Sequence, residues 1–417
     1  MDLDIHKKME ECLNCKTKPC TNGCPLNNDI PLFIEKAKNK QYKEAYQVLS
    51  KTTVLPAICG RICPHYKQCM SKCIRGIKGE PVSIGDIEEY IGKISITNEY
   101  QLPQSENEKA KSVAVIGSGP SGLTCAAFLK MHGFKVTIFE KNHELGGILK
   151  NGIPDFRLNK KVLDKTIEKI INLGIDVKYD CELGKNIYLN DLVNRFDAIY
   201  LAMGANVAKK MEIEGEDLNG IYSGNQLLEE GIHPDFEGKN VAIIGGGNVA
   251  IDSARTIRRM GANSISIIYR RDEDEMPAES KEIKEAKNEN INFIFKTNVV
   301  KILGINMVEK IECVKTELIE KEGESRKVPI NINNSNYLMN IDYVVMALGS
   351  KTNNKLLNSL GLELTKDEYI KINDNSQTSI SKVFAGGDLV GERATVAWAA
   401  RSGRNAAERI EKFLDNK

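Results

Sequence analysis

Two segments of the chain share one pattern, in which an apolar strand runs into a glycine-rich turn, a helix and a second apolar strand. The expected strand, helix and strand lie at residues 112–117, 123–132 and 135–140 in the first segment, and at 240–245, 248–260 and 264–269 in the second. Each segment is typical of the βαβ unit of a dinucleotide-binding fold. Later strands at 343–348 and 382–385 are β-branched, which suits a parallel sheet covered on both faces.

The first glycine-rich turn is a complete GxGxxG fingerprint between a strand and a helix. Gly117 makes the turn, Gly119 lets the backbone approach a pyrophosphate, and Gly122 permits close helix packing. Glu140 ends the following strand, where a carboxylate accepts hydrogen bonds from ribose hydroxyls. The residues expected to contact this nucleotide are Gly117, Gly119, Pro120, Ser121, Gly122 and Glu140.

The second turn is a GxGxxA variant, and its second strand ends in arginines instead of a carboxylate. The residues expected to contact the nucleotide there are Gly245, Gly247, Asn248, Val249, Ala250, Arg270 and Arg271. An arginine can pair with a 2′-phosphate that a carboxylate would repel, which favours NADP(H) over NAD(H). The alternative is that Arg270 and Arg271 are a solvated pair beside the acidic run at 272–275. An acidic first site and a basic second site predict FAD followed by NADP(H).

Eight of the 11 cysteines are crowded between Cys12 and Cys73. They form two groups of four, which are Cys12, Cys15, Cys20 and Cys24, and then Cys59, Cys63, Cys69 and Cys73. A proline follows Cys24 and Cys63, as at ferredoxin-type sites, where the last cysteine of a run can ligate the other cluster. The block predicts two [4Fe-4S] clusters. Two zinc sites are the alternative, although zinc cannot carry an electron.

Composition narrows the class of partner. The formal net charge is +1, which gives no field to attract nucleic acid or an anionic membrane. No apolar run is long enough to span a membrane, and the polar start does not resemble a signal peptide, so we expect a cytoplasmic protein. There is no HExxH or GxSxG motif, which argues against a hydrolase.

We expect an α/β protein with a helical N-terminal iron–sulfur domain and two Rossmann-like domains. Residues 1–105 lack βα alternation and hold the cysteines and a helical stretch over 30–49, and a polar stretch at 102–111 marks a linker. The expected domains are 1–105 with two clusters, 106–235 and 341–417 for FAD, and 236–340 for NAD(P)H.

On these residues the chain resembles the small (β) subunit of glutamate synthase, nearly from end to end. Similar modules occur in electron-bifurcating ferredoxin:NADP oxidoreductases and dihydropyrimidine dehydrogenases. The matching stretches are both cysteine groups, Cys59-Gly60-Arg61-Ile62-Cys63-Pro64, residues 146–158, Tyr269-Arg270-Arg271, Glu275-Met276-Pro277-Ala278 and Ala385-Gly386-Gly387-Asp388. The resemblance implies a glutathione-reductase-like arrangement in which the NADPH domain is inserted in the FAD domain.

The resemblance also implies roles for single residues. It implies that Cys12, Cys15, Cys20 and Cys73 hold one [4Fe-4S] cluster and that Cys24, Cys63, Cys69 and Glu88 hold the other. Cys59 is then left over, and a count from the sequence alone would choose it instead of Glu88. Near FAD the resemblance places Gly146, Gly147, Arg157, Gly387, Asp388 and Thr395.

The sequence therefore predicts a flavoprotein oxidoreductase in which NADPH reduces FAD and single electrons pass through the clusters to a partner protein. No separate acid–base residues are expected, because the cofactors carry the hydride transfer. The expected partner is a glutamate synthase large subunit, or a ferredoxin or flavoprotein in another complex. A non-redox protein with two structural zincs is the alternative from another class.

Overall fold

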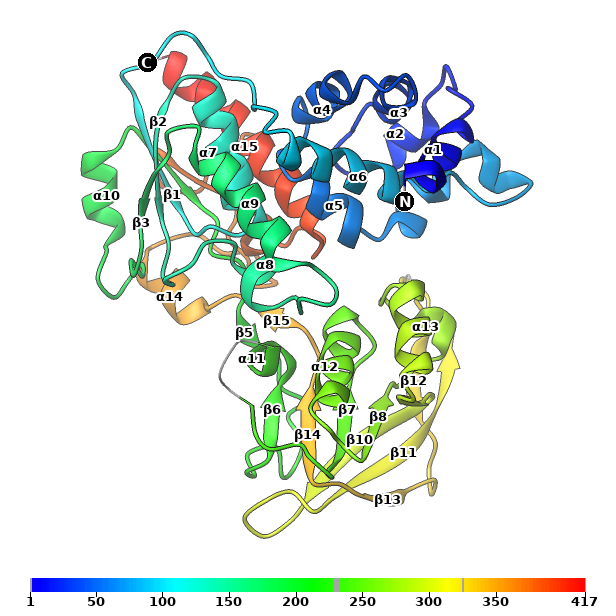
Figure 1. Ribbon diagram of the computed structural model, residues 1–417. Helices are drawn as coiled ribbons and strands as arrows, with labels where there is room; N and C mark the ends of the chain where they lie inside the picture. Colours follow the sequence, from blue (N-terminus) through cyan, green and yellow to red (C-terminus); the bar gives the residue numbers. More distant parts are fainter. Residues whose placement is uncertain (1, 229–232, 325, 417) are drawn as a thin grey trace. The chain divides into compact units, whose positions relative to one another are not determined.

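Residues 2–228, 233–324 and 326–416 are described by the computed structural model (Figure 1). The chain forms two units. Unit 1 contains Met1–Lys150, Asp155–Ala205 and Thr352–Lys417, and unit 2 contains Asn151–Pro154 and Asn206–Lys351. The second unit is thus inserted in the chain of the first. The four ranges predicted from the sequence are a finer division and stay a prediction.

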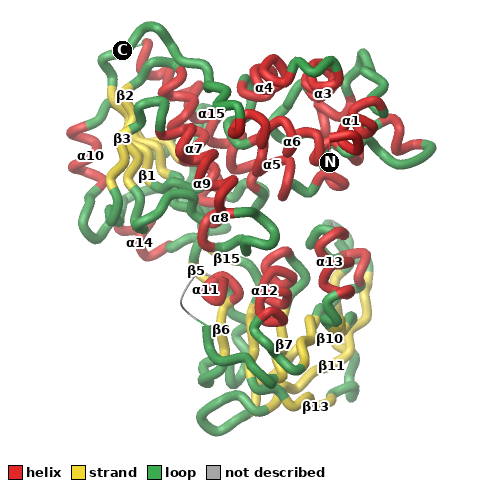
Figure 2. The backbone as a smooth tube through the Cα atoms, viewed as in Figure 1, coloured by secondary structure: helices red, strands yellow, loops and turns green. Residues whose placement is uncertain are grey.

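The N-terminal part of unit 1 is built from helices and loops, as Figure 2 shows. Its helices are α1 (Asp2–Glu10), α2 (Pro19–Gly23), α3 (Ile30–Lys38), α4 (Tyr42–Ser50), α5 (Pro56–Ile62), the short 3₁₀ turns η1 (His65–Lys67), η2 (Met70–Lys72) and η3 (Ile74–Ile77), and α6 (Ile84–Thr97). Buried Phe33, Tyr46 and Leu49 form part of its core. The single helical stretch expected over 30–49 was wrong. Lys40 has a left-handed backbone (φ 59°), which ends α3 and separates it from α4.

The remainder of unit 1 is a five-stranded parallel sheet with helices. The strand order is β16 (Val383–Ala385), β4 (Ala198–Leu201), β1 (Ser112–Ile116), β2 (Lys135–Phe139) and β3 (Asp176–Lys178). Its helical elements are α7 (Pro120–Met131), α8 (Ile148–Asn151), α9 (Lys160–Ile171), α10 (Leu189–Arg195), α14 (Asn354–Ser359), η5 (Gly387–Val390) and α15 (Val396–Asp415).

The first fingerprint lies at the point where this strand order reverses. The chain passes from β1 outward to β2 and β3, and then returns to β4 on the other side of β1. Ligands of such sheets bind beyond the carboxyl ends of the strands at this point. Apolar Ile116, Ile199 and Leu201 are buried against α10, while α7 and the C-terminal helix α15 pack together beside the sheet (Figure 1).

Unit 2 repeats the parallel sheet and adds an antiparallel one. The parallel order is β6 (Ile221–Ser223), β14 (Tyr343–Met346), β7 (Asn240–Ile244), β8 (Ser264–Ile268) and β9 (Asn292–Ile294). The antiparallel strands are β10 (Thr297–Leu303), β11 (Lys310–Ile319), β12 (Val328–Asn331) and β13 (Tyr337–Asn340), with the pair β5 (Val207–Ala208) and β15 (Ser350–Lys351). The helices are α11 (Gly224–Leu228), α12 (Asn248–Arg259), η4 (Glu273–Glu275) and α13 (Ser280–Asn288).

Both faces of the parallel sheet in unit 2 are buried. Ile243 and Ile267 pack on one face with α12 and α13, and Ile244 and Ile268 pack on the other with the antiparallel strands. This explains why the strands read as almost continuous apolar runs in the sequence. Among the helices of residues 2–228, 233–324 and 326–416, none is both long enough and apolar enough to cross a membrane.

Candidate functional site

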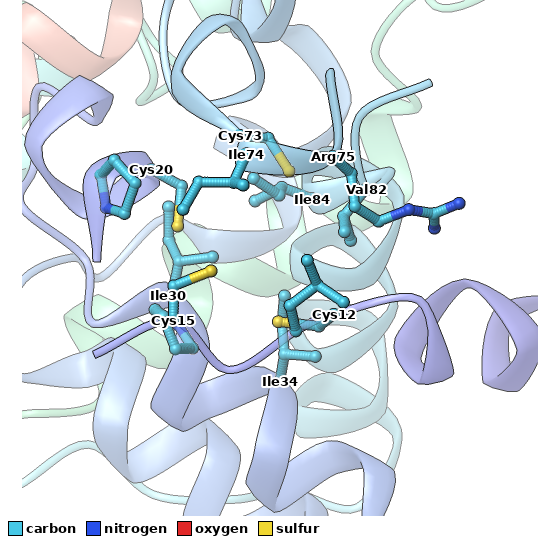
Figure 3. A pocket seen from close by; sticks show the side chains of 13 residues that line it. Cys12, Cys15, Cys20, Ile30, Ile34, Cys73, Ile74, Arg75, Val82 and Ile84 are labelled. Atoms are coloured by element: carbon cyan, nitrogen blue, oxygen red, sulfur yellow. The ribbon is translucent and has the colours of Figure 1, made fainter. Parts of the chain in front are cut away.

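Four cysteines from three separate segments surround one cavity in the helical part of unit 1. Figure 3 shows the sulfur atoms of Cys12, Cys15, Cys20 and Cys73 directed toward the same space. We call these four residues the outer group, because Cys12, Cys15 and Cys73 are half-buried and only Cys20 is buried. The rest of the lining is mainly apolar and comes from Leu13, Pro19, Ile30, Pro31, Ile34, Ile74, Val82 and Ile84, with Arg75.

The outer group has the chemistry of a metal-cluster site. The pKa of Cys20 is raised to about 11, first by burial and then by the neighbouring thiols of Cys12 and Cys73. The pKa of Cys12 is also raised, first by burial and then by Cys15 and Cys73. Four thiolates this close repel one another in an apolar cavity, and metal cations remove that cost. The outer group, which the resemblance assigned to one cluster, therefore has side chains of the right chemistry to bind that cluster.

A second set of candidate ligands is more deeply buried. We call Cys24, Cys59, Cys63, Cys69 and Glu88 the inner group; all five side chains are buried. The pKa of Cys24 is raised to about 12 by burial, then by Glu88 and by Cys59. Cys63 has a raised pKa because of a hydrogen bond with Cys59, burial, and the charges of Glu88 and Cys24. The structure thus brings together five candidate ligands where a cluster needs four.

Glu88 is a carboxyl group in an apolar interior. Burial raises its pKa to about 8, although Asn28 Nδ2 donates a hydrogen bond to Glu88 Oε1 at 3.1 Å. Such a group must lose a proton to bind iron, as the thiols must. Cys20 of the outer group also acts on the pKa of Cys69, so the two groups are neighbours. In the described part of the chain, no three His, Cys, Asp or Glu side chains are arranged to hold a single metal ion.

The first fingerprint forms the turn between β1 and α7. Gly117 has a φ of 98°, and a Cβ on Gly122 would lie 2.0 Å from the Gly117 carbonyl oxygen. By contrast, a Cβ on Gly119 would meet nothing within 4 Å, so the space above this residue is open. Pro120 and Ser121 begin α7, whose first N–H groups have no partners within the helix. This is the environment that a pyrophosphate needs.

Glu140 lies beside this turn with its carboxylate already bound within the chain. Glu140 Oε2 accepts hydrogen bonds from the N–H (2.9 Å) and Oγ (2.5 Å) of Ser118, and Oε1 accepts one from the N–H of Asn142 at 3.0 Å. A carboxylate has about four acceptor positions, so one is left for a ribose hydroxyl. The sequence did not indicate that Ser118 holds this carboxylate.

The loop at 146–158 is placed against the same turn. The N–H of Gly146 donates to Ser118 Oγ at 3.0 Å, and a Cβ on Gly147 would lie 3.0 Å from the Cα of the second fingerprint glycine. Arg157 is buried, and its carbonyl oxygen accepts a hydrogen bond from Arg61 Nε of α5 at 2.9 Å. This loop therefore connects the fingerprint to the helix that carries Cys59.

A second loop closes the site from the C-terminal side. A Cβ on Gly387 would lie 3.1 Å from the Cβ of Ser121, so this loop lies directly on the start of α7. The pKa of half-buried Asp388 is raised by burial and by Glu392. Thr395 caps α15, where its hydroxyl accepts a hydrogen bond from the N–H of Trp398 at 3.4 Å. The structure thus places Gly387 at the start of α7, and Asp388 and Thr395 lie on the segment that follows Gly387 in the chain.

The second fingerprint, in unit 2, has the same geometry between β7 and α12. Gly245 has a φ of 147°, and a Cβ there would lie 2.3 Å from the carbonyl oxygen of Ala347. At Gly247 the only neighbour of an added Cβ would be a carbon of Pro277, at 3.9 Å. Asn248 begins α12 and its Oδ1 accepts the N–H of Glu279 at 3.0 Å. Val249 and Ala250 follow in the first turn, and Ala250 is fully buried.

The two arginines after β8 differ in how far their side chains are bound within the chain. Arg270 is exposed, and Thr316 Oγ1 donates to its carbonyl oxygen at 2.8 Å. Arg271 Nε donates to the carbonyl oxygen of Lys327 at 3.0 Å, so part of this guanidinium is bound within the chain. A third arginine, Arg326, was not expected from the sequence. Its Nη2 donates to Tyr269 Oη at 3.0 Å. Arg326 carries a third positive charge to this loop from the β11–β12 connection.

Comparisons with known proteins agree with both parts of the chain. Residues 111–403 match the family described as pyridine nucleotide-disulphide oxidoreductase, and residues 2–100 match dihydropyrimidine dehydrogenase domain II, 4Fe-4S cluster. The glutamate synthase [NADPH] small chain of Escherichia coli is 34% identical over 97% of this chain and 90% of its own length. The chain belongs to the glutamate synthase small-chain family. The predicted resemblance and the assignment to the oxidoreductases are confirmed.

Other members and neighbours of the family show its range. The NADPH-Fe(3+) oxidoreductase subunit beta of Geobacter sulfurreducens is 32% identical over 96% of this chain, which covers 64% of that protein. Among solved structures, FprA of Mycobacterium tuberculosis in complex with NADPH has a TM-score of 0.65 and 20% identity, over 74% of this chain and 85% of FprA. The predicted α/β fold class is confirmed.

Proposed function

We propose that this family member is an NAD(P)H-dependent flavoprotein that passes single electrons to a partner protein. In this proposal the first fingerprint binds FAD, the second binds NADP(H), and the outer and inner groups each hold a [4Fe-4S] cluster. The flavin supplies the conversion of a two-electron hydride into single electrons, and clusters carry electrons singly. The matched family descriptions and the NADPH in the names of the relatives support this assignment.

The observation that carries the proposal is the order of the sites within unit 1. The inner group is buried next to the elements that form the first fingerprint, because Arg61 of α5 binds the loop at 146–158. The outer group is at the surface, where Leu13 is 62%, Ile74 is 40% and Ile77 is 78% exposed. A buried group near the flavin site and a neighbouring group at the surface form a path on which electrons leave the protein.

In the proposal, the residues of the chain bind and orient the cofactors. The FAD pyrophosphate binds in the open space above Gly119, where the N–H groups at the start of α7 donate to it. Glu140 accepts a hydrogen bond from a ribose hydroxyl. Gly146, Gly147, Arg157, Gly387, Asp388 and Thr395 surround the remainder of that site. In unit 2, the start of α12 receives the second pyrophosphate, and Arg270, with Arg271, binds the 2′-phosphate.

For the inner cluster we propose Cys24, Cys63, Cys69 and Glu88 as ligands. The hydrogen bond from Asn28 supports Glu88, because a hydrogen bond to a ligating carboxyl group fixes its orientation toward the metal. Cys59 is the alternative fourth ligand, and the iron content of variants at the two positions distinguishes Cys59 from Glu88. We expect Cys59→Ser to retain the iron of two clusters and Glu88→Ala to lose part of it. The reverse result would make Cys59 the ligand.

The partner is proposed from the names of the relatives. Small chain and subunit beta are names of proteins in complexes, which supports a hetero-oligomer with an electron-accepting subunit. A large subunit of the glutamate synthase kind is the first candidate. A different acceptor, such as a ferredoxin or another flavoprotein, is the second, because the Geobacter relative has another named activity. The crowded unpaired cysteines suit a reducing compartment, and we propose the cytoplasm.

The test uses the full chain, purified without oxygen and mixed with NADPH or NADH. We expect NADPH to be oxidised faster than NADH with ferricyanide as acceptor, because Arg270 binds the 2′-phosphate. We also expect no glutamate from glutamine and 2-oxoglutarate, since the two units are already occupied by the proposed cofactor sites. A protein that oxidises neither nucleotide would refute the proposal. Glutamate formation by the chain alone would refute the need for a large subunit.

A further inference from the structure

Arg404 is a buried arginine of α15 that none of the cofactor motifs includes. It is 9% exposed. Arg404 Nη1 donates two hydrogen bonds, to the carbonyl oxygens of Leu26 (2.9 Å) and Thr52 (2.8 Å). Leu26 is two residues beyond Cys24, so the guanidinium lies on the loop that follows an inner-group ligand. A contact between residues 378 positions apart in the chain thus joins the C-terminal helix to the cysteine block.

The positive charge of Arg404 lies close to the inner group, and no buried carboxylate is paired with it in the described part of the chain. Burial lowers the pKa of Arg404, while Glu408 and Cys24 raise it. An arginine side chain keeps its proton even so. The nearest carboxylate is Glu408, whose Oε1 is 3.8 Å from Arg404 Nε and whose side chain is 52% exposed, so water screens it. As a cluster-bound thiolate, Cys24 would be the other negative group acting on Arg404, while Arg401 adds a positive charge nearby.

The same turn of α15 also contacts the first fingerprint. Ser402 Oγ accepts a hydrogen bond from the N–H of Gly387 at 2.9 Å. A Cβ on Gly403 would lie 2.1 Å from the carbonyl oxygen of Ser121, so only glycine lets α15 lie so close to α7. Three consecutive residues therefore touch the proposed flavin site and the loop beside the inner group. This turn is a rigid connection between the two.

We propose that Arg404 is a positioning residue that raises the reduction potential of the inner cluster and fixes its place relative to the flavin site. The inference depends on the proposed function. A cluster held by the inner group would gain one unit of negative charge on reduction, and the buried positive charge of Arg404 would stabilise that form. Net charge, hydrogen bonding and burial are the features by which a protein sets the potential of such a cluster.

The test is a redox titration of the full chain, reconstituted with iron and sulfide and followed by low-temperature EPR. We expect Arg404→Gln to make reduction of one cluster at least tenfold less favourable, which is a shift of about 59 mV to lower potential. The other cluster and the rate of flavin reduction by NADPH stay unchanged. Lys412→Gln, which removes an exposed charge from the same helix, is the matched control and leaves both potentials unchanged.

A second variant, which removes a negative charge beside Arg404, tests the same inference if Arg404→Gln does not fold. Glu408→Gln removes the negative charge nearest to Arg404 at an exposed position and retains both carbonyl hydrogen bonds. We expect it to raise the potential of the same cluster, by less than Arg404→Gln lowers it, because water screens part of the Glu408 charge. The inference is overturned if neither variant moves a potential, or if both clusters shift equally. Wild-type protein that holds no cluster after reconstitution would instead refute the proposed function.

Discussion

Two glycines of the first fingerprint are three positions apart, and the structure predicts different results for the same substitution. Gly119→Ala places a methyl group in open space on an extended backbone (φ −66°, ψ −177°) that alanine adopts readily. The free energy of unfolding should stay within about 1 kcal/mol of wild type. The methyl group, however, occupies the space where the pyrophosphate approaches. Loss of one hydrogen bond to a charged group, about 1.5–3 kcal/mol, weakens FAD binding by about 10–150-fold.

Gly122→Ala should damage the fold itself. The new Cβ would lie 2.0 Å from the Gly117 carbonyl oxygen, whereas a carbon and an oxygen in contact are about 3.3–3.6 Å apart. The turn must therefore move by more than about 1 Å, and overpacking of this kind costs about 1–3 kcal/mol or more. Only this variant should be destabilised, and it should also lose FAD.

The assay is urea unfolding of both flavin-free variants by circular dichroism, together with FAD titration by flavin fluorescence. The two measurements separate a loss of binding from a loss of folding. If Gly119→Ala bound FAD as tightly as wild type, the pyrophosphate would not lie above this residue. Equal destabilisation of both variants would show that the open space is not present in solution.

Two further predictions concern unit 2. Arg270→Ala should raise the KM for NADPH by about 10–100-fold and leave the KM for NADH unchanged. An equal effect on both nucleotides would show that Arg270 does not bind the 2′-phosphate. Burial acts to raise the pKa of Glu289, but hydrogen bonds from Arg259 and Arg255 outweigh it and lower that pKa to about 2. Because the folded pKa lies below the unfolded one, this stability is present above pH 4.5 and lost as the pH falls toward 2. Glu289→Gln should cost roughly 1 kcal/mol at neutral pH and flatten the loss between pH 4.5 and 3 in urea unfolding, and an unchanged acid profile would contradict this.

The sequence predicted the repeated βαβ units because their residues carry the required information locally. The turn at Gly117 and the apolar run before it lie within a few residues of each other, and the same is true at Gly245. The division of the helix at Lys40 could not be predicted, since no glycine or proline marks it. There the left-handed residue is a lysine, which that conformation disfavours.

Residues of one segment could be grouped from the sequence alone, whereas Cys73 was joined to Cys12, Cys15 and Cys20 only through the family resemblance, and other contacts between distant segments were missed. Arg404 binds Leu26, and no periodicity or spacing connects two positions so far apart. Ser118 lies inside the fingerprint at a position that the motif leaves open, so its bond to Glu140 appears only in the structure. The choice between Glu88 and Cys59 is likewise set by packing, because α5 and α6 bring both to the inner group.

In the proposed function, NADPH would reduce a bound flavin, and its electrons would reach the iron–sulfur clusters. The most direct measurement is the absorption and low-temperature EPR spectrum of the anaerobically purified chain, before and after one equivalent of NADPH. We expect flavin bands over a broad cluster shoulder, bleaching by NADPH faster than by NADH, and an EPR signal from a reduced cluster. A colourless protein with bound zinc and no response to NADPH would contradict it.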